Sequence, residues 1–148
     1  MRRESQKHME FDIRLIEKEK LGMIIPLLAR LNPKIPISVL EGRLVEMKTQ
    51  GYECVGIFDG KILVGISGIW MLTKYYVGKH IEPDNVYVLP EYRGNGLGER
   101  LMDWIYEYAK SQGCSASELN CYVKNEAGQR FWKRQGYEIL GYHYQKQL

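Results

Sequence analysis

The sequence predicts an α/β fold, with helices on the faces of a mixed sheet, in one domain that covers residues 1–148. Three observations lead to this prediction. Residues 52–58 and 61–70 are typical of two strands joined by the turn Asp59-Gly60. From Leu97 onward, apolar residues recur at helical spacing. The predicted order of elements, β-α-α-β-β-β-α-β-α-β, fits the core that 148 residues can bury.

The chain starts with a strand and a helix. Residues 1–9 precede the first predicted element, and we expect them to form a disordered extension. Residues 11–15 alternate apolar and polar side chains, which indicates a strand. Residues 21–31 predict a helix, in which Pro26 marks an irregularity or a break. The prolines of residues 32–36 indicate a loop.

A second helix is predicted over residues 39–50. Ser38 is a candidate N-cap, and Glu41 three residues later completes the pattern of a capping box. Gly51 ends the helix, because glycine adopts the left-handed conformation that commonly follows a helix. The hairpin at residues 52–70 comes next, and residues 71–78 are predicted as a loop or a strand end.

The second half of the chain predicts a parallel crossover. Residues 82–88 form a strand that Pro90 closes, and a long helix then runs from Leu97 to Gly113. Residues 119–123 return as a strand. A strand, helix and strand in this order predict a right-handed crossover between parallel neighbours.

A short helix and a last strand complete the predicted fold. Asn125 is a candidate cap for a helix that runs to Gln135, and Gly136 ends it. Residues 137–144 predict the final strand. No internal repeat or low-complexity segment interrupts this order.

Composition excludes several classes of function. No apolar run approaches the roughly 20 residues that span a bilayer, and the first residues lack the apolar stretch of a signal peptide, so we expect a cytoplasmic protein that binds no membrane. The net charge of +3 comes from scattered basic residues, which predicts no nucleic-acid partner. Three cysteines without close spacing predict neither a disulfide framework nor a metal site; Cys54 and Cys121 are expected to pack as small apolar side chains.

The most informative segment is the glycine-rich turn at residues 93–98, which lies between a predicted strand and a predicted helix. Helix N-termini present unpaired N–H groups and a partial positive charge, and glycine lets an anion approach the main chain closely. Arg93 adds a cation, so the segment predicts an anion-binding site. The segment is not a P-loop, because no Gly-Lys-Ser/Thr follows it. It is not a dinucleotide-binding loop either, because Glu99 stands where that pattern needs a third glycine.

This segment resembles the signature of the GNAT superfamily of N-acetyltransferases, Arg/Gln-x-x-Gly-x-Gly/Ala. Arg93, Gly96 and Gly98 match it in order, and residues 86–94 resemble a common form of the preceding strand. Residues 125–137, with Asn-Glu-Ala, Phe-Trp and Gly-Tyr in turn, resemble the family's C-terminal block. The resemblance implies a mostly antiparallel sheet with a V-shaped splay between its two central strands. It also implies that the chain is an enzyme.

The resemblance assigns the family's contacts with acetyl-CoA to individual residues of this sequence. The resemblance implies that main-chain N–H groups of the turn bind the pyrophosphate, and that a bulged strand pairs with the pantetheine arm and polarises the thioester. Asn125 resembles an asparagine that touches this arm, although capping a helix is an equally good explanation. The expected cofactor-binding residues are Tyr87, Val88, Arg93, Gly94, Asn95, Gly96, Leu97, Gly98 and Asn125.

The expected chemistry is attack by a primary amine, of a small molecule or a peptide, on the thioester in a ternary complex, without a metal. A base must remove a proton from the amine. Glu82 matches the place of a glutamate base in some family members, and Asp84 is the alternative; in a regular strand the two share a face. A solvated strand end would explain both residues equally.

The proton donor for the leaving thiolate departs from the family pattern. The family often uses a tyrosine where this chain has Trp132, and an indole N–H is no practical acid. Tyr122, Tyr137 and Tyr142 are the candidates that remain. An alternative function is therefore a regulatory module that binds acyl-CoA without efficient turnover. A plain interaction domain is a third.

The predicted acceptor pocket combines aromatic walls with carboxylates, which suits a cationic amine. Trp70, Tyr75 and Tyr76 are candidates for its walls, with Glu82 and Asp84 beside them, although Trp70 is also typical of a core residue. A homodimer is compatible with the family resemblance.

Overall fold

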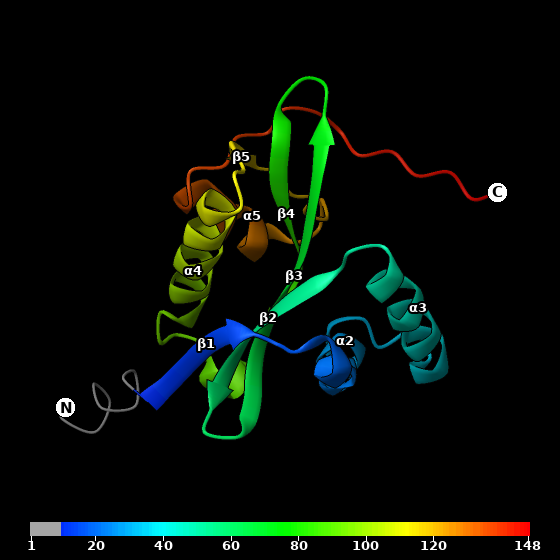
Figure 1. Ribbon diagram of the computed structural model, residues 1–148, viewed down its shortest axis with the longest axis vertical. Helices are drawn as coiled ribbons and strands as arrows, with labels where there is room; N and C mark the ends of the chain where they lie inside the picture. Colours follow the sequence, from blue (N-terminus) through cyan, green and yellow to red (C-terminus); the bar gives the residue numbers. More distant parts are fainter. Residues whose placement is uncertain (1–9) are drawn as a thin grey trace.

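The structure is a computed structural model that describes residues 10–148, so the expected extension at residues 1–9 lies outside it. Its five-stranded sheet has the order β1-β2-β3-β4-β5 (Figure 1). Neighbouring strands are antiparallel except β4 and β5, which are parallel. The predicted α/β class and mixed, mostly antiparallel sheet are confirmed. The strands are β1 (Phe11–Leu15), β2 (Glu53–Asp59), β3 (Ile62–Lys74), β4 (Gly78–Val88) and β5 (Ala116–Ser117).

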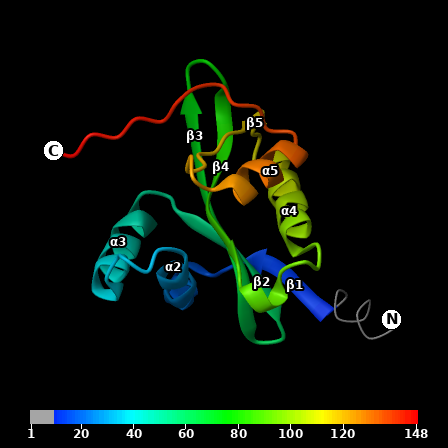
Figure 2. The ribbon, with the colours of Figure 1, turned by 180° about the vertical axis from the view of Figure 1, so that it is seen from behind.

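Helices cover both faces of the sheet. Figures 1 and 2 show α2 and α3 on one side, with α4 and α5 on the other. The helical segments are η1 (Lys18–Ile24), α2 (Ile25–Leu31), α3 (Ile37–Thr49), η2 (Pro90–Tyr92), α4 (Leu97–Ser111) and α5 (Glu126–Arg134). None of the helices in residues 10–148 has the length and apolar character needed to cross a membrane.

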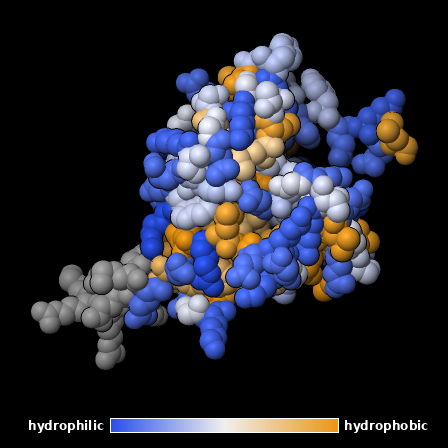
Figure 3. All heavy atoms as spheres, viewed as in Figure 1, coloured by the Kyte–Doolittle hydropathy of each residue, from blue (hydrophilic) through white to orange (hydrophobic). Residues whose placement is uncertain are grey.

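The core extends to both sides of the sheet, with α4 on one side and η1, α2 and α3 on the other. Leu97, Leu101, Ile105 and Ala109 on α4 are buried, which confirms the predicted apolar stripe. They pack against the buried branched side chains of the central strands. Figure 3 shows that polar residues cover most of one outer face, with apolar residues gathered across its middle and over the α2–α3 side. The stripe holds α4 in place, and its N-terminus is therefore fixed relative to the sheet.

β4 carries a bulge next to a close approach between strands. Ile66 pairs with Tyr87 but Gly68 pairs with Asp84, so β4 has one more residue than β3 here. Asn85 lies in the bulge with φ of 39°, a conformation that asparagine tolerates better than most residues. A Cβ on Gly68 would lie 2.3 Å from Oδ1 of Asn85, so only glycine fits there. The bulge expected for this strand is confirmed.

β4 and β5 diverge after a very short ladder. Only His80 with Ala116 and Ile81 with Ser117 form pairs, and the N–H of Glu118 adds one bond to the carbonyl of Ile81. The predicted parallel pairing across α4 is confirmed. Beyond Ile81, residues 82–88 of β4 have no strand partner on the β5 side within the described chain. This divergence is the V-shaped splay.

Some local predictions were wrong. The strand predicted at residues 119–123 is absent, and only Ala116–Ser117 pairs with β4. Residues 137–144 form no strand either, and they pair with no strand of the described chain. The helix predicted at residues 21–31 is a 3-10 segment followed by α2, with Pro26 in the first turn of α2, where its missing N–H costs nothing.

The predicted cap at Ser38 was also wrong. The helix α3 begins at Ile37, with Pro36 at the N-cap position and no side-chain cap. Ser38 therefore lies within the first turn, where its hydroxyl does not cap the helix. β3 and β4 form a second hairpin, since β3 continues to Lys74 and β4 already starts at Gly78; residues 71–74 and 78–81 therefore lie in strands.

Candidate functional site

The turn at residues 93–98 presents a row of free main-chain donors at the start of α4. The first helical bond joins the N–H of Arg100 to the carbonyl of Gly96 at 3.1 Å. Within residues 10–148, the N–H groups of residues 94–99 have no recorded acceptor. Gly94 and Gly96 have φ of 79° and 72°, a region that favours glycine. The turn therefore combines unpaired donors with the positive end of a helix dipole, as an anion site requires.

Side chains hold this turn against β4. The Nε of Arg93 donates to the carbonyl of Val88 at 2.8 Å, and its guanidinium carbon lies 5.3 Å from the centre of the Tyr87 ring. The Nδ2 of Asn95 donates to the carbonyl of Tyr92 at 3.1 Å. These contacts link the turn to the end of β4, so both are positioned as one unit.

Leu97 and Gly98 have packing roles in this unit. Leu97 is 2% exposed and anchors the first turn of α4 in the core. A Cβ on Gly98 would lie 3.3 Å from the ring of Phe131, so this glycine lets α5 approach α4 closely. The sequence prediction gave Gly98 a role toward the cofactor only, and the helix contact adds a second one.

The open side of β4 lies next to the turn. Tyr87 and Val88 pair with Ile66 and Gly65 of β3, while no strand pairs with their other side. Asn125 lies at the start of α5, and its Oδ1 accepts from the N–H of Gly128 at 2.9 Å. Asn125 is therefore a helix cap in this structure, and its contact with a cofactor stays a prediction.

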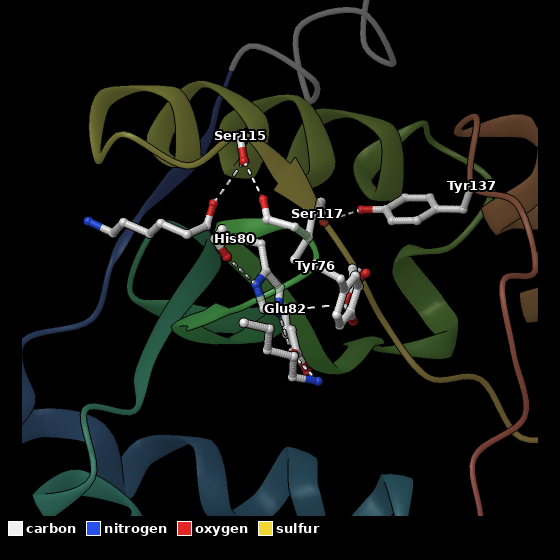
Figure 4. A network of polar contacts seen from close by, with 11 residues as sticks. Tyr76, His80, Glu82, Ser115, Ser117 and Tyr137 are labelled. Atoms are coloured by element: carbon white, nitrogen blue, oxygen red, sulfur yellow. Dashed lines mark hydrogen bonds and ion pairs between the residues drawn. The ribbon is translucent and has the colours of Figure 1, made fainter.

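Glu82 belongs to a cluster of polar side chains at the point where β4 and β5 part (Figure 4). The Nε2 of His80 lies 2.7 Å from Oε2 of Glu82 and 3.6 Å from Oε1 of Glu118. The Tyr76 hydroxyl donates to the same oxygen of Glu118 at 2.6 Å. Lys74 approaches Oε2 of Glu82 at 3.8 Å. The cluster thus joins the β3–β4 hairpin, β4 and the chain after β5.

His80 makes polar contacts through both of its ring nitrogens. Its imidazole is fully buried, and Nδ1 lies 3.2 Å from the carbonyl of Gly78, which can only accept. Nδ1 therefore carries a hydrogen, and Nε2 faces two carboxylates that also accept. Nε2 lies between the carboxylates of Glu82 and Glu118, and Lys74 adds a second basic group beside Glu82.

Among the described residues, His80, Glu82 and Glu118 form a group that could hold a metal ion. The ligand atoms of His80, Glu82 and Glu118 lie within 4.8 Å of one another. His80 and Lys74 contact Oε2 of Glu82, and Tyr76 donates to Oε1 of Glu118, so we assign these atoms to polar contacts within the chain. The absence of a metal from the reaction stays a prediction.

Asp84, the alternative base, lies on the same face of β4 as Glu82, because the bulge begins after it. Its Oδ2 accepts from the Trp70 indole at 3.0 Å, and Oδ1 accepts from the main-chain N–H of Asn85 at 2.9 Å. The Trp70 ring lies 5.1 Å from the ring of Tyr52 and is half-buried. Trp70 is therefore more than a core residue, since it connects the core to an exposed carboxylate.

The three candidate acids differ in their surroundings. The hydroxyl of Tyr137 lies 2.6 Å from Oγ of Ser117 in β5 (Figure 4). Its ring packs edge-on against Trp132 at 5.5 Å, and Trp132 packs in turn against Phe131. Tyr122 and Tyr142 are 78% and 83% exposed. Only Tyr137 is held beside the sheet, and Trp132 is a packing residue in this aromatic group.

The comparison with known families agrees with this geometry. The family model for the acetyltransferase (GNAT) family matches residues 29–137. The chain belongs to the GNAT family. The match includes both the turn before α4 and the segment from Asn125 to Tyr137, so the resemblance predicted from the sequence is confirmed.

Several curated N-acetyltransferases are similar to this GNAT chain. Thialysine N-epsilon-acetyltransferase of Mus musculus is 27% identical over 85 residues, which are 57% of this chain and 50% of the mouse protein. Glucosamine 6-phosphate N-acetyltransferase of Trypanosoma brucei brucei is 30% identical over 115 residues, which are 72% of this chain and 76% of that protein. The chain spans about half the length of the thialysine acetyltransferases from mouse and cattle that it matches.

Solved GNAT structures share the fold. An aminoglycoside N-acetyltransferase solved with CoA has a TM-score of 0.80 at 18% identity, and the match covers 93% of this chain and 95% of that one. A ribosomal-protein-alanine N-acetyltransferase from Brucella melitensis biovar Abortus 2308 has a TM-score of 0.79 at 23% identity, covering 93% and 99%. At these identities the similarity establishes the fold.

The structure adds residues that the sequence prediction missed in this GNAT domain. His80 and Glu118 flank Glu82, but both fell outside the predicted strands, and so nothing placed them beside it. Asn85 also escaped notice. Its Oδ1 accepts from the Tyr52 hydroxyl at 3.0 Å, while its Nδ2 is buried and has no partner among the described residues. Burial raises the pKa of Tyr52, so this hydroxyl keeps its proton.

Proposed function

We propose that this chain transfers the acetyl group of acetyl-CoA to a primary amine by direct attack within a ternary complex. The observation that supports it most is the row of unpaired N–H groups at residues 94–99, directly beside the open side of β4. The N–H groups suit a pyrophosphate, and the open side of β4 suits an amide-containing arm. The relatives that match are named as N-acetyltransferases of amines, which agrees with this assignment.

The proposed cofactor site binds one part of acetyl-CoA at the turn before α4 and another along the open side of β4. The N–H groups of Gly94 through Gly98 hold the pyrophosphate, and Arg93 adds a positive charge beside it. The pantetheine amides pair with Tyr87 and Val88, whose side toward β5 has no strand partner. Asn125 lines a surface hollow with Tyr122 and Val123, from which it reaches the same arm. No metal has a part in this scheme.

Glu82 is the proposed base. It lies beside His80 and Lys74, and its side chain remains 22% exposed, so a bound amine reaches it directly or through a water. The recorded contacts use its Oε2, and Oε1 has no recorded partner in the described chain. Asp84 is the alternative, since it lies about 7 Å nearer to Val88 along the strand. Both of its oxygens already accept hydrogen bonds.

Tyr137 is the proposed donor to the leaving thiolate. Its bond to Ser117 fixes the hydroxyl at the β5 side of the splay, which neither Tyr122 nor Tyr142 achieves. Trp132 occupies the usual tyrosine position and orients Tyr137 by ring packing. A hydroxyl held in this way donates to a thiolate that forms on the β4 side.

The proposed acceptor is a cationic amine of a small molecule or a peptide. Trp70 and Tyr76 present aromatic rings on the side of the sheet where Glu82 and Asp84 lie, a combination that attracts ammonium groups. Tyr75 is fully exposed, and its ring packs edge-on against Tyr76 with the ring centres 5.7 Å apart. We further propose a single N-acetyltransferase domain over residues 1–148 that works in the cytoplasm without a nucleic-acid or membrane partner.

A second candidate function is a module that binds acyl-CoA without efficient turnover. The specific observation in its favour is Trp132, which packs against Phe131 and Tyr137 at the position where an acid would stand. It predicts the same cofactor site and no catalysis.

Two measurements separate these functions. Calorimetry with CoA and acetyl-CoA tests the cofactor site. Release of free CoA thiol across a panel of polyamines, aminoglycosides, amino sugars, amino acids and peptides tests transfer. Binding with turnover of one amine class supports the enzyme, binding without turnover supports the module, and no binding of either cofactor form contradicts both.

A further inference from the structure

Four residues around the bulge of β4 form a closed cycle of contacts, which we call the bulge network. The Tyr52 hydroxyl donates to Oδ1 of Asn85 at 3.0 Å, and the main-chain N–H of Asn85 donates to Oδ1 of Asp84 at 2.9 Å. Oδ2 of Asp84 accepts from the Trp70 indole at 3.0 Å, and the Trp70 ring lies 5.1 Å from the Tyr52 ring. The bulge network thus joins two residues of the proposed acceptor side, Trp70 and Asp84, to the irregular part of β4.

Before the bulge, the main chain of β4 alternates in a fixed sense. The main-chain groups of successive residues in a strand face opposite edges. The carbonyl of Ile81 accepts from the N–H of Glu118 at 3.0 Å, so Ile81 faces the β5 side. The groups of Asp84, three residues later, therefore face β3, where Asp84 pairs with Gly68.

After the bulge, the alternation has the opposite sense. The N–H of Leu89 donates to the carbonyl of Val64 in β3 at 2.9 Å, so Leu89 faces β3. The carbonyl of Val88 accepts from Arg93 at 2.8 Å, which places the groups of Val88 on the open side of β4. An uninterrupted alternation from Asp84 would have turned Val88 toward β3. The bulge is therefore the reason that the N–H of Val88 faces the open side.

The position of the bulge decides this outcome. If the extra residue lay beyond Val88, the N–H of Val88 would bond to β3 and its carbonyl would no longer face Arg93. Asn85 adopts a φ of 39°, which asparagine tolerates better than most residues. The branched side chains of Val86 and Val88 strongly disfavour such a conformation. The local sequence therefore favours a bulge at Asn85 over one nearer to the turn at residues 93–98.

The Tyr52 hydroxyl fixes Asn85 in this conformation. Tyr52 is 2% exposed, so water cannot replace its bond to Asn85. Burial raises the pKa of Tyr52, and the hydroxyl therefore remains a donor. A Cβ on Gly68 would lie 2.6 Å from this hydroxyl, so the glycine of β3 leaves the space that the bond occupies.

The amide of Asn85 has a cost that glycine would avoid. Its Nδ2 is buried and has no partner among the described residues. A buried donor without a partner destabilises a fold, whereas glycine adopts a positive φ without strain and adds no such donor. A residue that is unfavourable for stability at a strained position indicates a functional role.

We infer that Asn85 and Tyr52 are positioning residues for acetyl transfer: their bond fixes the bulge, and the bulge turns the N–H of Val88 toward the acyl donor. This inference rests on the proposed function, in which the coenzyme arm follows the open side of β4. The bulge network also includes Asp84 and Trp70, so the acceptor side and the donor side are held in one geometry. Asn85 and Tyr52 act through Val88 and need not touch either substrate.

A double-mutant cycle tests the role by kinetics. Tyr52→Phe and Asn85→Gly are each expected to lower kcat by about tenfold. Because both changes break the same bond, the double variant is expected to lose no more than about the larger single effect. Tyr108→Phe, which removes a hydroxyl bonded to Glu53 on the α4 side of the sheet, is the matched control and should change kcat less than about twofold. Losses that multiply in the double variant, or an equal loss in the control, overturn the inference.

Thermal unfolding separates positioning from a purely structural role. The double variant removes both partners of the bond together with the unpaired Nδ2, so it is expected to melt within about 3 °C of the parent chain or above it, while kcat falls. A double variant that melts more than about 10 °C below the parent chain would assign both residues to stability and overturn the inference.

Amide hydrogen exchange measures the bulge without any reaction. In the parent chain the N–H of Leu89 bonds to β3 and that of Val88 does not, so NMR is expected to show Val88 exchanging about tenfold faster or more. In the double variant the bulge is no longer fixed, and the two rates are expected to converge to within about threefold. A ratio that the double variant leaves unchanged overturns the inference. If the parent chain transfers no acetyl group to any amine, the proposed function fails, while the exchange ratio still decides whether Tyr52 and Asn85 hold the bulge.

Discussion

Nε2 of His80 lies 2.7 Å from Oε2 of Glu82, and the imidazole that makes this bond is completely buried. A buried hydrogen-bond partner fixes the direction of a carboxyl group far better than a solvated one, because water cannot replace it. Glu118 approaches the same nitrogen from the chain after β5. The position of the proposed base therefore depends on a residue that no substrate touches.

The role of His80 in positioning Glu82 can be tested by substitution. His80→Leu is expected to lower kcat by about 10- to 100-fold with little change in the KM for acetyl-CoA, since it releases Glu82 without touching the turn at 94–98. His80→Gln, whose amide reaches the place of Nε2, is expected to restore part of the rate. Steady-state kinetics with both substrates check this. An unchanged kcat in a folded His80→Leu variant would refute the role.

The two carboxylates of β4 are expected to differ. Glu82→Gln removes the proposed base and should lower kcat by about 10²- to 10⁴-fold while calorimetry shows unchanged acetyl-CoA affinity. Asp84→Asn, which keeps an acceptor for the Trp70 indole, is the matched variant and should cost less than tenfold. The reverse order of the two effects would move the base to Asp84.

The turn before α4 predicts a loss of cofactor binding in Gly96→Asp. The new carboxylate would enter the proposed pyrophosphate site, and we expect at least a tenfold weaker affinity for acetyl-CoA, about 1.4 kcal/mol. Gly96→Ala separates backbone strain at φ of 72° from the effect of charge. Gly42→Asp on the exposed face of α3, where a Cβ meets nothing within 4 Å, controls for net charge. Equal affinities for all three variants by calorimetry would place the anion site elsewhere.

The proton donor is tested by a pair of aromatic substitutions. Tyr137→Phe keeps the ring packing on Trp132 but removes the hydroxyl bonded to Ser117, and we expect a fall in kcat of about tenfold or more. Trp132→Phe keeps an aromatic ring beside Tyr137 and should change kcat less than threefold. Thiol release at saturating substrates measures both. If only Trp132→Phe is slow, the tryptophan has a direct role.

Cys54 predicts a fall in stability at alkaline pH. Burial raises the pKa of its thiol from 9.0 to about 12, so the folded chain keeps a proton that the unfolded chain releases. The stabilising contribution is complete below pH 9 and declines as the pH rises toward 12, by about 1.4 kcal/mol per pH unit for one group. Urea unfolding at several pH values, with Cys54→Ala for comparison, measures it. An equal slope in both chains would show that other groups, such as the buried Tyr52, account for the decline.

The elements with strong local patterns were predictable from the sequence. The stripe that begins at Leu97 fixed α4 to within about two residues, because a helix repeats its apolar face every turn. The Asp59-Gly60 turn gave the β2–β3 hairpin for a similar reason. Residues 119–123 and 137–144 have equally good strand patterns and still form no ladder, since a strand depends on a neighbour that local sequence cannot supply.

The candidate site was predictable only in part. The turn at 93–98 was found because its glycines and the helix after it are contiguous. His80 was missed because the predicted strand started at Glu82, although a strand that started at Gly78 would have placed the two side chains on one face. Glu118 comes from a distant segment, and its contact with His80 follows from the short β4–β5 ladder alone. No local pattern encodes such a contact.

The unpaired donors of residues 94–99 and the free side of β4 have a consequence for the catalytic cycle. Both would recognise the diphosphate and the amide chain of the coenzyme, parts that are identical before and after the acetyl group has left. Free CoA would then bind at the same site with nearly the affinity of acetyl-CoA. Release of free CoA would then limit turnover, and accumulated CoA would inhibit the reaction by competing with acetyl-CoA.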